Sequence, residues 1–234
     1  IKNISEIIKK ENKKRKSNKI IFHIDAAQAP NYLDCNVNKL GVDLMTLDSH
    51  KIYGPKGVGA LYICSGVHLE PILGYGSQEF GLRQGTENVP GIVGFGQAIE
   101  RIKINKKENK RILKLRDKLI DGIIKLIPNS KLNGPLKNRL PNNVNFSFAG
   151  AEGESILTLL SQKGIYISTG SACASQSLKP SHILLAIGLT SEQAHCSIRL
   201  SLGKQTSDKD IDYVLEVLPK VIDKLRKISG RLNK

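Results

Sequence analysis

The chain has 234 residues, of which 40% are hydrophobic and 24% are charged. This length and composition allow a buried core and predict one large or two small globular domains. No apolar run is long enough to span a membrane, so we expect no membrane association.

The formal net charge is +15, and most of the excess lies in two lysine-rich stretches at 9–19 and 103–118. Neither stretch has interleaved aromatic residues, and no nucleic-acid-binding motif accompanies them. The pattern therefore favours a solvated basic surface over direct nucleic-acid binding, and an acidic protein partner stays open.

Four cysteines, Cys35, Cys64, Cys173 and Cys196, are widely spaced and form no CxxC pair. This spacing argues against a zinc site or a redox dithiol, so we expect no metal and reduced thiols. With no secretory signal pattern in the sequence, we expect a cytoplasmic protein.

The first half of the chain alternates helical and strand-like segments. Residues 3–18 have a helical pattern, and three apolar runs at 20–24, 42–47 and 58–63 predict strands, the first of them buried on both faces. Ligands of α/β sheets bind beyond the carboxyl ends of the strands, where Asp25 and Lys51 would both lie.

A long helical segment at 90–127 separates this region from shorter alternating elements. Strands are expected at 144–148, 165–168 and 196–202, with helices beginning at Glu154, at Ser181 and near Ser207. We therefore predict two domains, 1–100 and 101–234, the second of the α+β kind.

A lysine follows a histidine in the stretch "DSHKIYGPKGVGALY" at 48–62. Most turn lysines are surface lysines, but Lys51 has the donors Ser49 and His50 beside it and could form a Schiff base if partly desolvated. The glycines fit neither GxxxxGK[ST] nor GxGxxG, so both nucleotide-binding loops are rejected.

Three further residues each have two interpretations. Asp25 is either a cap or salt-bridge partner, or the partner of a protonated ring nitrogen, with the amide of Gln28 nearby. Cys173, among small residues in a polar loop, is either a free surface thiol or a nucleophile. Arg199, inside an apolar strand, is either a structural ion-pair partner or a fork for a substrate carboxylate.

Five motifs occur in an order that resembles the pyridoxal-phosphate-dependent cysteine desulfurases of the class V aminotransferase superfamily, in the branch that supplies iron–sulfur cluster assembly and nitrogen fixation. They are "HIDAAQAP", "SHKIYGPKGVGALY", "GLRQGTENVPGIVGFGQA", "GSACAS" and "HCSIRLSLG". The resemblance implies an α/β fold of the aspartate aminotransferase type. Residues 1–100 would then be the C-terminal part of the large cofactor domain, and 101–234 the small domain with the catalytic cysteine loop.

The resemblance also implies roles around pyridoxal 5'-phosphate. Lys51 matches the lysine that binds the cofactor covalently and moves the proton of the substrate Cα. Asp25 matches the partner of the pyridine nitrogen and Gln28 the amide near the ring hydroxyl, while Ser49 and His50 fall in the segment that contacts cofactor and phosphate. The Cys173 thiol needs a proton acceptor to react at neutral pH, and the two candidates are His50 and the substrate amine.

Three more residues are matched. Thr86 corresponds to a threonine that reaches the phosphate of the neighbouring subunit, which implies a homodimer. Arg199 corresponds to the residue that binds the carboxylate of L-cysteine, and Cys173 to the thiol that accepts its sulfur. The implied activity is conversion of L-cysteine to L-alanine with a persulfide on Cys173, which is then passed to an acceptor protein such as an iron–sulfur scaffold.

Two departures and two alternatives accompany this prediction. Asp48 stands where the family often has a phosphate-binding serine, and the family's N-terminal part does not precede Ile1, so we expect a piece of a longer protein. The alternatives are a selenocysteine lyase, and a truncated relative that binds a partner without catalysis.

Overall fold

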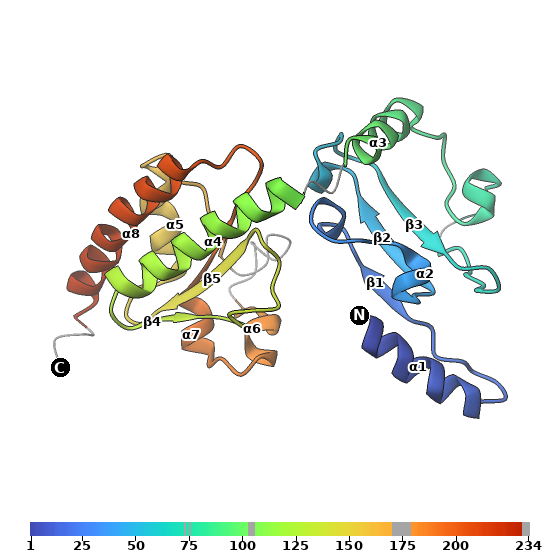
Figure 1. The fold of residues 1–234 in the computed structure, drawn as a ribbon, viewed down its shortest axis with the longest axis horizontal. Coiled ribbons are helices and arrows are strands. Elements are labelled where there is room, and N and C mark those ends of the chain that lie inside the picture. The colour runs from blue at the N-terminus through green and yellow to red at the C-terminus, as the bar shows by residue number, and fades with distance from the viewer. Residues whose placement is uncertain (73, 75, 103–105, 170–178, 231–234) are drawn as a thin grey trace. The chain divides into compact units, whose positions relative to one another are not determined.

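The computed structural model describes residues 1–72, 74, 76–102, 106–169 and 179–230. The chain forms two compact units, Ile1–Asn105 and Lys106–Lys234, and each is described by itself. Both combine helices with a three-stranded sheet, which confirms the α/β class expected from the sequence (Figure 1).

The first unit contains one mixed sheet. Its elements are α1 (Lys2–Lys14), β1 (His23–Asp25), η1 (Ala29–Asn31), α2 (Val37–Leu40), β2 (Leu44–Asp48), η2 (His50–Ile52), β3 (Gly59–Ile63), η3 (Gln78–Gly81) and α3 (Val89–Arg101). The strand order is β1-β2-β3, with β1 parallel to β2 and β3 antiparallel to β2. The parallel pair requires a crossover, and α2 lies in it.

Two small apolar clusters stabilise the first unit. One contains Ala26, Val42 and Met45, and the other joins Ile52 to Phe95 and Ala98 of α3. The expectation that the first strand is buried on both faces is wrong, because β1 is an edge strand and two of its three residues are exposed.

The second unit has an antiparallel sheet covered by long helices. Its elements are α4 (Lys106–Leu126), β4 (Ser130–Leu132), β5 (Asn143–Phe148), α5 (Gly153–Ser161), α6 (His182–Ala186), α7 (Ser191–His195), β6 (Ser197–Ser201) and α8 (Asp208–Ser229). The order is β4-β5-β6, and α8 packs against both α4 and α5 (Figure 1).

The core of the second unit follows from the alternation along β5. Val144, Phe146 and Phe148 point to one face and are fully buried, and the two phenylalanine rings lie 5.9 Å apart. The amphipathic helices α4 and α8 add Leu119, Ile123, Leu218 and Ile222 to the buried set. This apolar core positions β6, which carries Arg199 at its centre.

Two predictions for the chain after residue 90 differ from the structure, and two short elements were not predicted. The segment 165–168 is not a strand and contributes only a bridge between Ser168 and Arg199. The helical stretch 90–127 is two helices, α3 and α4. Strand β4 and helix α7 are short and were not predicted.

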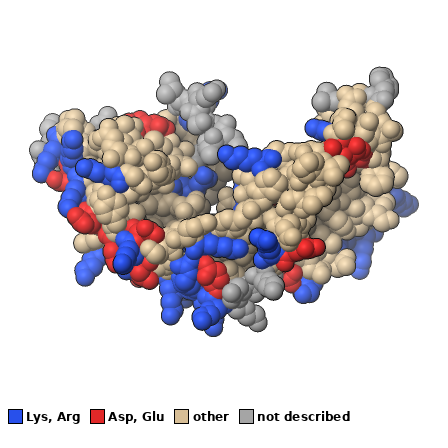
Figure 2. Space-filling model, turned by 90° about the horizontal axis from the view of Figure 1, so that it is seen from above, with Lys and Arg blue, Asp and Glu red and all other residues tan. Residues whose placement is uncertain are grey.

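The surface carries both signs of charge. On the face drawn in Figure 2, lysines and arginines are interspersed with aspartates and glutamates. Lysines also pair with acids of the same helix, as Lys220 does with Glu216 (2.8 Å) and Lys227 with Asp223 (2.7 Å). Within the described ranges, no helix is long and apolar enough to cross a membrane.

Candidate active site

Lys51 lies in the tight connection between β2 and β3. Strand β2 ends at Asp48, the 3-10 turn η2 follows, and the amides of Ile52 and Gly54 both donate to the carbonyl of Ser49, at 3.0 and 2.9 Å. The adjacent Tyr53 has a left-handed backbone, with a φ of 68°. The turn leaves the Lys51 side chain accessible, with 37% of its surface exposed.

Asp48 contacts both residues of the histidine–lysine pair. Its Oδ1 accepts from the backbone amide of His50 (3.1 Å) and lies 2.7 Å from His50 Nδ1. Its Oδ2 is 3.5 Å from Lys51 Nζ. The Asp48 carboxylate is therefore turned toward the side chains of its own turn.

Ser49 is buried beneath the turn. Its side chain is fully buried, and its hydroxyl has no hydrogen-bond partner among the described residues. A Cβ added at Gly54 would collide with this hydroxyl and would also approach Ala98 of α3. The geometry gives Ser49 a packing position under the turn, away from the surface that exposes Lys51.

Asp25 and Gln28 follow the end of the neighbouring strand β1. Asp25 is paired with Thr46 of β2, and its Oδ1 accepts from the amide of Ala27 at 2.9 Å. Both Asp25 and Gln28 are exposed. Because β1 and β2 are parallel, their carboxyl ends lie at the same sheet edge, which brings the Asp25 and Lys51 segments together as predicted.

A residue that the sequence analysis missed joins these segments. Asn31, at the end of η1, donates from Nδ2 to the backbone carbonyl of Lys51 at 2.8 Å. Its Oδ1 is buried and has no hydrogen-bond partner among the described residues. The sequence signal was weak, since an asparagine after a proline is ordinary turn composition.

Thr86 lies in the exposed segment between η3 and α3, directly after Gly85, whose φ is +110°. Both residues are open to solvent in this chain. The predicted contact with a neighbouring subunit stays a prediction.

Arg199 lies at the centre of β6 in the second unit. Its backbone pairs with Asn145 of β5 on one side. On the other side, its carbonyl accepts from the amide of Ser168 at 3.0 Å and its amide donates to the carbonyl of Ser168 at 2.7 Å. Its Nε is buried without a hydrogen-bond partner among the described residues. A buried guanidinium donor without a partner is costly, and an anionic ligand would satisfy it.

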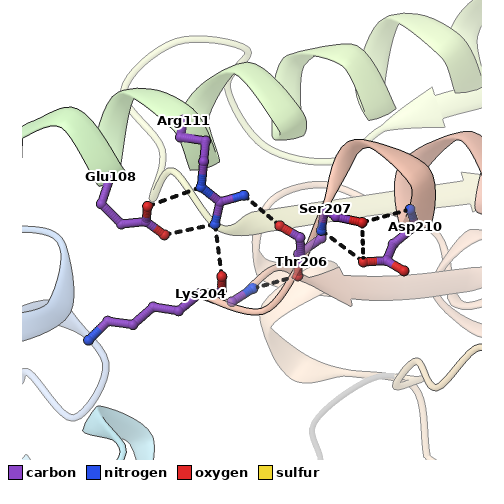
Figure 3. Close-up of polar contacts among 7 residues, drawn as sticks. Glu108, Arg111, Lys204, Thr206, Ser207 and Asp210 are labelled. Atoms are coloured by element: carbon purple, nitrogen blue, oxygen red, sulfur yellow. Dashed lines mark hydrogen bonds and ion pairs between the residues drawn. The ribbon is translucent and has the colours of Figure 1, made fainter.

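The loop after β6 is held by a polar network (Figure 3). Arg111 of α4 forks onto Glu108 and donates to the carbonyls of Thr206 (2.5 Å) and Lys204 (2.9 Å). The Arg111 fork lowers the pKa of the Glu108 carboxyl below its ordinary value. Ser207 and Asp210 form a capping box that starts α8 directly after this loop.

Cys173 lies outside the described residues. Of the other cysteines, Cys196 is buried and Cys35 and Cys64 are half-buried. Desolvation, followed by the charge of Asp34, raises the pKa of the Cys35 thiol. Among the described residues, no three histidine, cysteine or acidic side chains come together as a metal site.

The chain belongs to the class V aminotransferase family, whose pattern matches residues 1–214. Within that family it is similar to proteins named cysteine desulfurase IscS. It is 53% identical over 232 residues to that of Clostridium botulinum (strain Hall), which covers 98% of this chain and 57% of the relative. With that of Methanosarcina thermophila it shares 52% over 230 residues, or 98% and 55% of the two chains.

Solved structures of NifS-like proteins are also similar to this chain. A NifS-like protein superposes with a TM-score of 0.82 at 36% identity and covers 95% of this chain and 56% of its own. The NifS-like protein from Rickettsia africae gives a TM-score of 0.82 at 30% identity, with 94% and 57% covered. The fold type implied by the motifs is confirmed, and the chain spans a little over half the length of these relatives.

Class V aminotransferases and cysteine desulfurases use pyridoxal phosphate. The first unit has residues suited to bind this cofactor covalently and to contact its ring, since Lys51, Asp25 and Gln28 are exposed where two adjacent parallel strands end. The fit is poorer for the phosphate, because Ser49 is buried and Asp48 is an acid.

Proposed function

We propose that the protein containing this chain is a cysteine desulfurase. The observation that carries the proposal is the common sheet edge of Asp25 and Lys51, in a chain about half identical to cysteine desulfurases. In the net reaction, L-cysteine and the thiol of Cys173 give L-alanine and a persulfide on Cys173. The substrate C–S bond breaks, an S–S bond forms, and the carbon that loses sulfur takes up a proton.

Each residue has a specific task in this reaction. Lys51 Nζ would bind the cofactor and would move the proton of the substrate Cα, and the bound cofactor would supply an electron sink. Asp25 would keep the ring nitrogen protonated, and Gln28 would donate to the ring hydroxyl. Arg199 binds the substrate carboxylate, which would pair its buried Nε.

The partners of the reaction belong to the same proposal. We propose that L-cysteine is the substrate, that Thr86 reaches the phosphate site of a second copy in a homodimer, and that the persulfide passes to an acceptor protein such as an iron–sulfur scaffold. A related solved protein, SspA, is described in complex with cysteine, at 32% identity and a TM-score of 0.65. The carboxylate of a bound cysteine is a suitable partner for the guanidinium of Arg199.

Two measurements test the proposal. Pyridoxal phosphate is added, the protein is reduced with borohydride, and the labelled lysine is mapped by peptide mass spectrometry. We expect label at Lys51, which Lys51→Arg abolishes and Lys56→Arg leaves in place. The protein at the length of its relatives is then assayed for alanine, and we expect Cys173→Ser to keep the label and lose alanine formation. Label scattered over surface lysines, or no alanine from the longer protein, would refute the proposal.

A further inference from the structure

The carboxylate of Asp48 is the least exposed member of a three-residue cluster. Its side chain is 22% exposed, against 37% for Lys51 and 46% for His50. Asp48 is the last residue of β2 and pairs with Gly59 of β3, so its backbone is fixed by the sheet. The carboxylate is thus held at a rigid position, with the histidine and the lysine turned toward it.

The geometry determines which nitrogen of His50 carries a proton. Asp48 Oδ1 lies 2.7 Å from Nδ1 and 3.1 Å from the backbone nitrogen of the same residue. An ionised carboxylate only accepts hydrogen bonds, so Nδ1 must be the protonated nitrogen. The neutral ring then has its free lone pair on Nε2, which makes Nε2 the proton-accepting atom.

The neighbouring Ser49 does not orient the His50 ring. Ser49 is buried under Gly54 and its hydroxyl has no partner among the described residues. A serine at position 48 would supply one hydroxyl without charge, whereas the carboxylate has one oxygen for His50 and another near Lys51 Nζ, at 3.5 Å. The two contacts also offset a negative charge in a place where a cofactor phosphate is expected.

We propose that Asp48 is a positioning residue that acts through His50. It fixes the imidazole by Nδ1 and so presents Nε2 as the proton acceptor of the site. The catalytic meaning of this role rests on the proposed desulfurase function, but the tautomer itself does not depend on it. In this chain, position 48 orients the histidine rather than donating to a phosphate.

The tautomer can be measured without cofactor or substrate. Long-range proton–nitrogen NMR spectra of the 15N-labelled chain distinguish the two neutral forms, and His50→Gln identifies the His50 signals. We expect the Nδ1-protonated form in the unsubstituted chain and in Asp48→Asn, whose amide oxygen still accepts. Asp48→Ala should shift the ring toward the Nε2-protonated form.

The matched control is Asp34→Asn, which removes a carboxylate paired to Lys39 at 2.7 Å elsewhere in the same unit. It should leave the His50 signals unchanged. An Nε2-protonated His50 in the unsubstituted chain, or the same His50 tautomer in the unsubstituted chain and in Asp48→Ala, would overturn the proposal. If Asp48→Ala unfolds, the tautomer of His50 in the unsubstituted chain still decides the proposal, because that measurement needs no variant.

A double-mutant cycle in the longer, cofactor-loaded protein tests whether Asp48 works through His50. Asp48→Ala should lower kcat for alanine formation about tenfold, the scale of partners that orient a histidine. In a His50→Gln background the same change should cost less than about twofold. Independent, multiplicative losses would overturn the proposal. Absence of alanine in every variant would refute the desulfurase function alone, because the NMR result decides the tautomer separately.

Discussion

The amide nitrogen of Asn31 donates to the backbone carbonyl of Lys51 at 2.8 Å. This bond joins the segment after β1, which carries Asp25 and Gln28, to the turn after β2, which carries Lys51. Two chain segments that are separated by α2 and a strand are thereby held as one edge. The relative placement of Asp25 and Lys51 depends on this side chain as well as on the sheet.

We expect Asn31→Ala to destabilise the first unit by about 1 kcal/mol, the usual net contribution of such a hydrogen bond. Amide exchange at Ile52 and Gly54, which bond within the Lys51 turn, should become faster. Urea unfolding and hydrogen exchange measure the two effects. Asn38→Ala, at an exposed site on α2, is the control and should change neither.

Two buried serines of the first unit should respond in opposite ways to alanine. Ser5 donates to the carbonyl of Gly41 at 2.7 Å, whereas the equally buried Ser49 has no partner among the described residues. Ser5→Ala should cost about 1 kcal/mol, and Ser49→Ala should be neutral or stabilising by up to about 1 kcal/mol. Urea midpoints compare them directly. A loss at Ser49 equal to that at Ser5 would indicate a missed partner.

Two glycines of α3 provide a similar contrast. A Cβ at Gly94 would lie 2.9 Å from Cγ of Pro55, in the loop after Lys51, whereas a Cβ at Gly96 meets open space. Gly96→Ala should stabilise the helix by about 0.5–1 kcal/mol. Gly94→Ala should lose about 1 kcal/mol or more, because the helix must move away from the loop. Equal gains in thermal stability would contradict the close approach.

Glu108 should make the stability of the second unit depend on acid pH. Its folded pKa is lowered, chiefly by the hydrogen bond from Arg111, so the stabilisation is present above the ordinary carboxyl pKa near 4.5. It is lost as pH falls through the lower, folded value. Glu108→Gln should therefore flatten the stability profile below about pH 4.5, measured by urea unfolding at each pH. Asp121→Asn, exposed on the same helix, should leave the profile unchanged.

Arg199 should control substrate affinity in the longer protein. Arg199→Lys keeps the charge but loses the fork and the Nε donor, so we expect KM for L-cysteine to rise about tenfold or more, with a smaller change in kcat. Arg226→Lys is the control, since Arg226 donates to the carbonyls of Ala149 and Asn129 in the same unit. An unchanged KM for Arg199→Lys would remove this residue from the substrate site.

The fold could be predicted where local pattern decides structure. The apolar runs at β2, β3, β5 and β6 are strands, and the amphipathic C-terminal segment is α8. The prediction from the run "IIFHI" was wrong. Its apolar residues predict burial on both faces, but the burial of a strand depends on what packs beside it, and β1 is an edge strand. Similarly, Tyr166 in "IYIS" is 84% exposed, and no pairing beyond one bridge forms there.

The site could be predicted only in part for a related reason. Parallel strands align their carboxyl ends, so Asp25 and Lys51 were expected at one edge. The direction of a side chain within a turn is not encoded in its spacing, and therefore neither the burial of Ser49 nor the contact of Asp48 with His50 could be anticipated. The link from Asn31 depends on a tertiary contact that no local pattern signals.

The antiparallel pairing of β2 and β3 has a consequence for how the chain acquires its site. Its partners run from Leu44 with Ile63 to Asp48 with Gly59, all close in sequence, and the Lys51 turn is enclosed between them. Contacts between sequence neighbours form quickly, because little loop-closure entropy opposes them. The parallel β1–β2 pairing must close a longer crossover. The lysine turn should thus form early in folding, before the strand that carries Asp25 docks beside it.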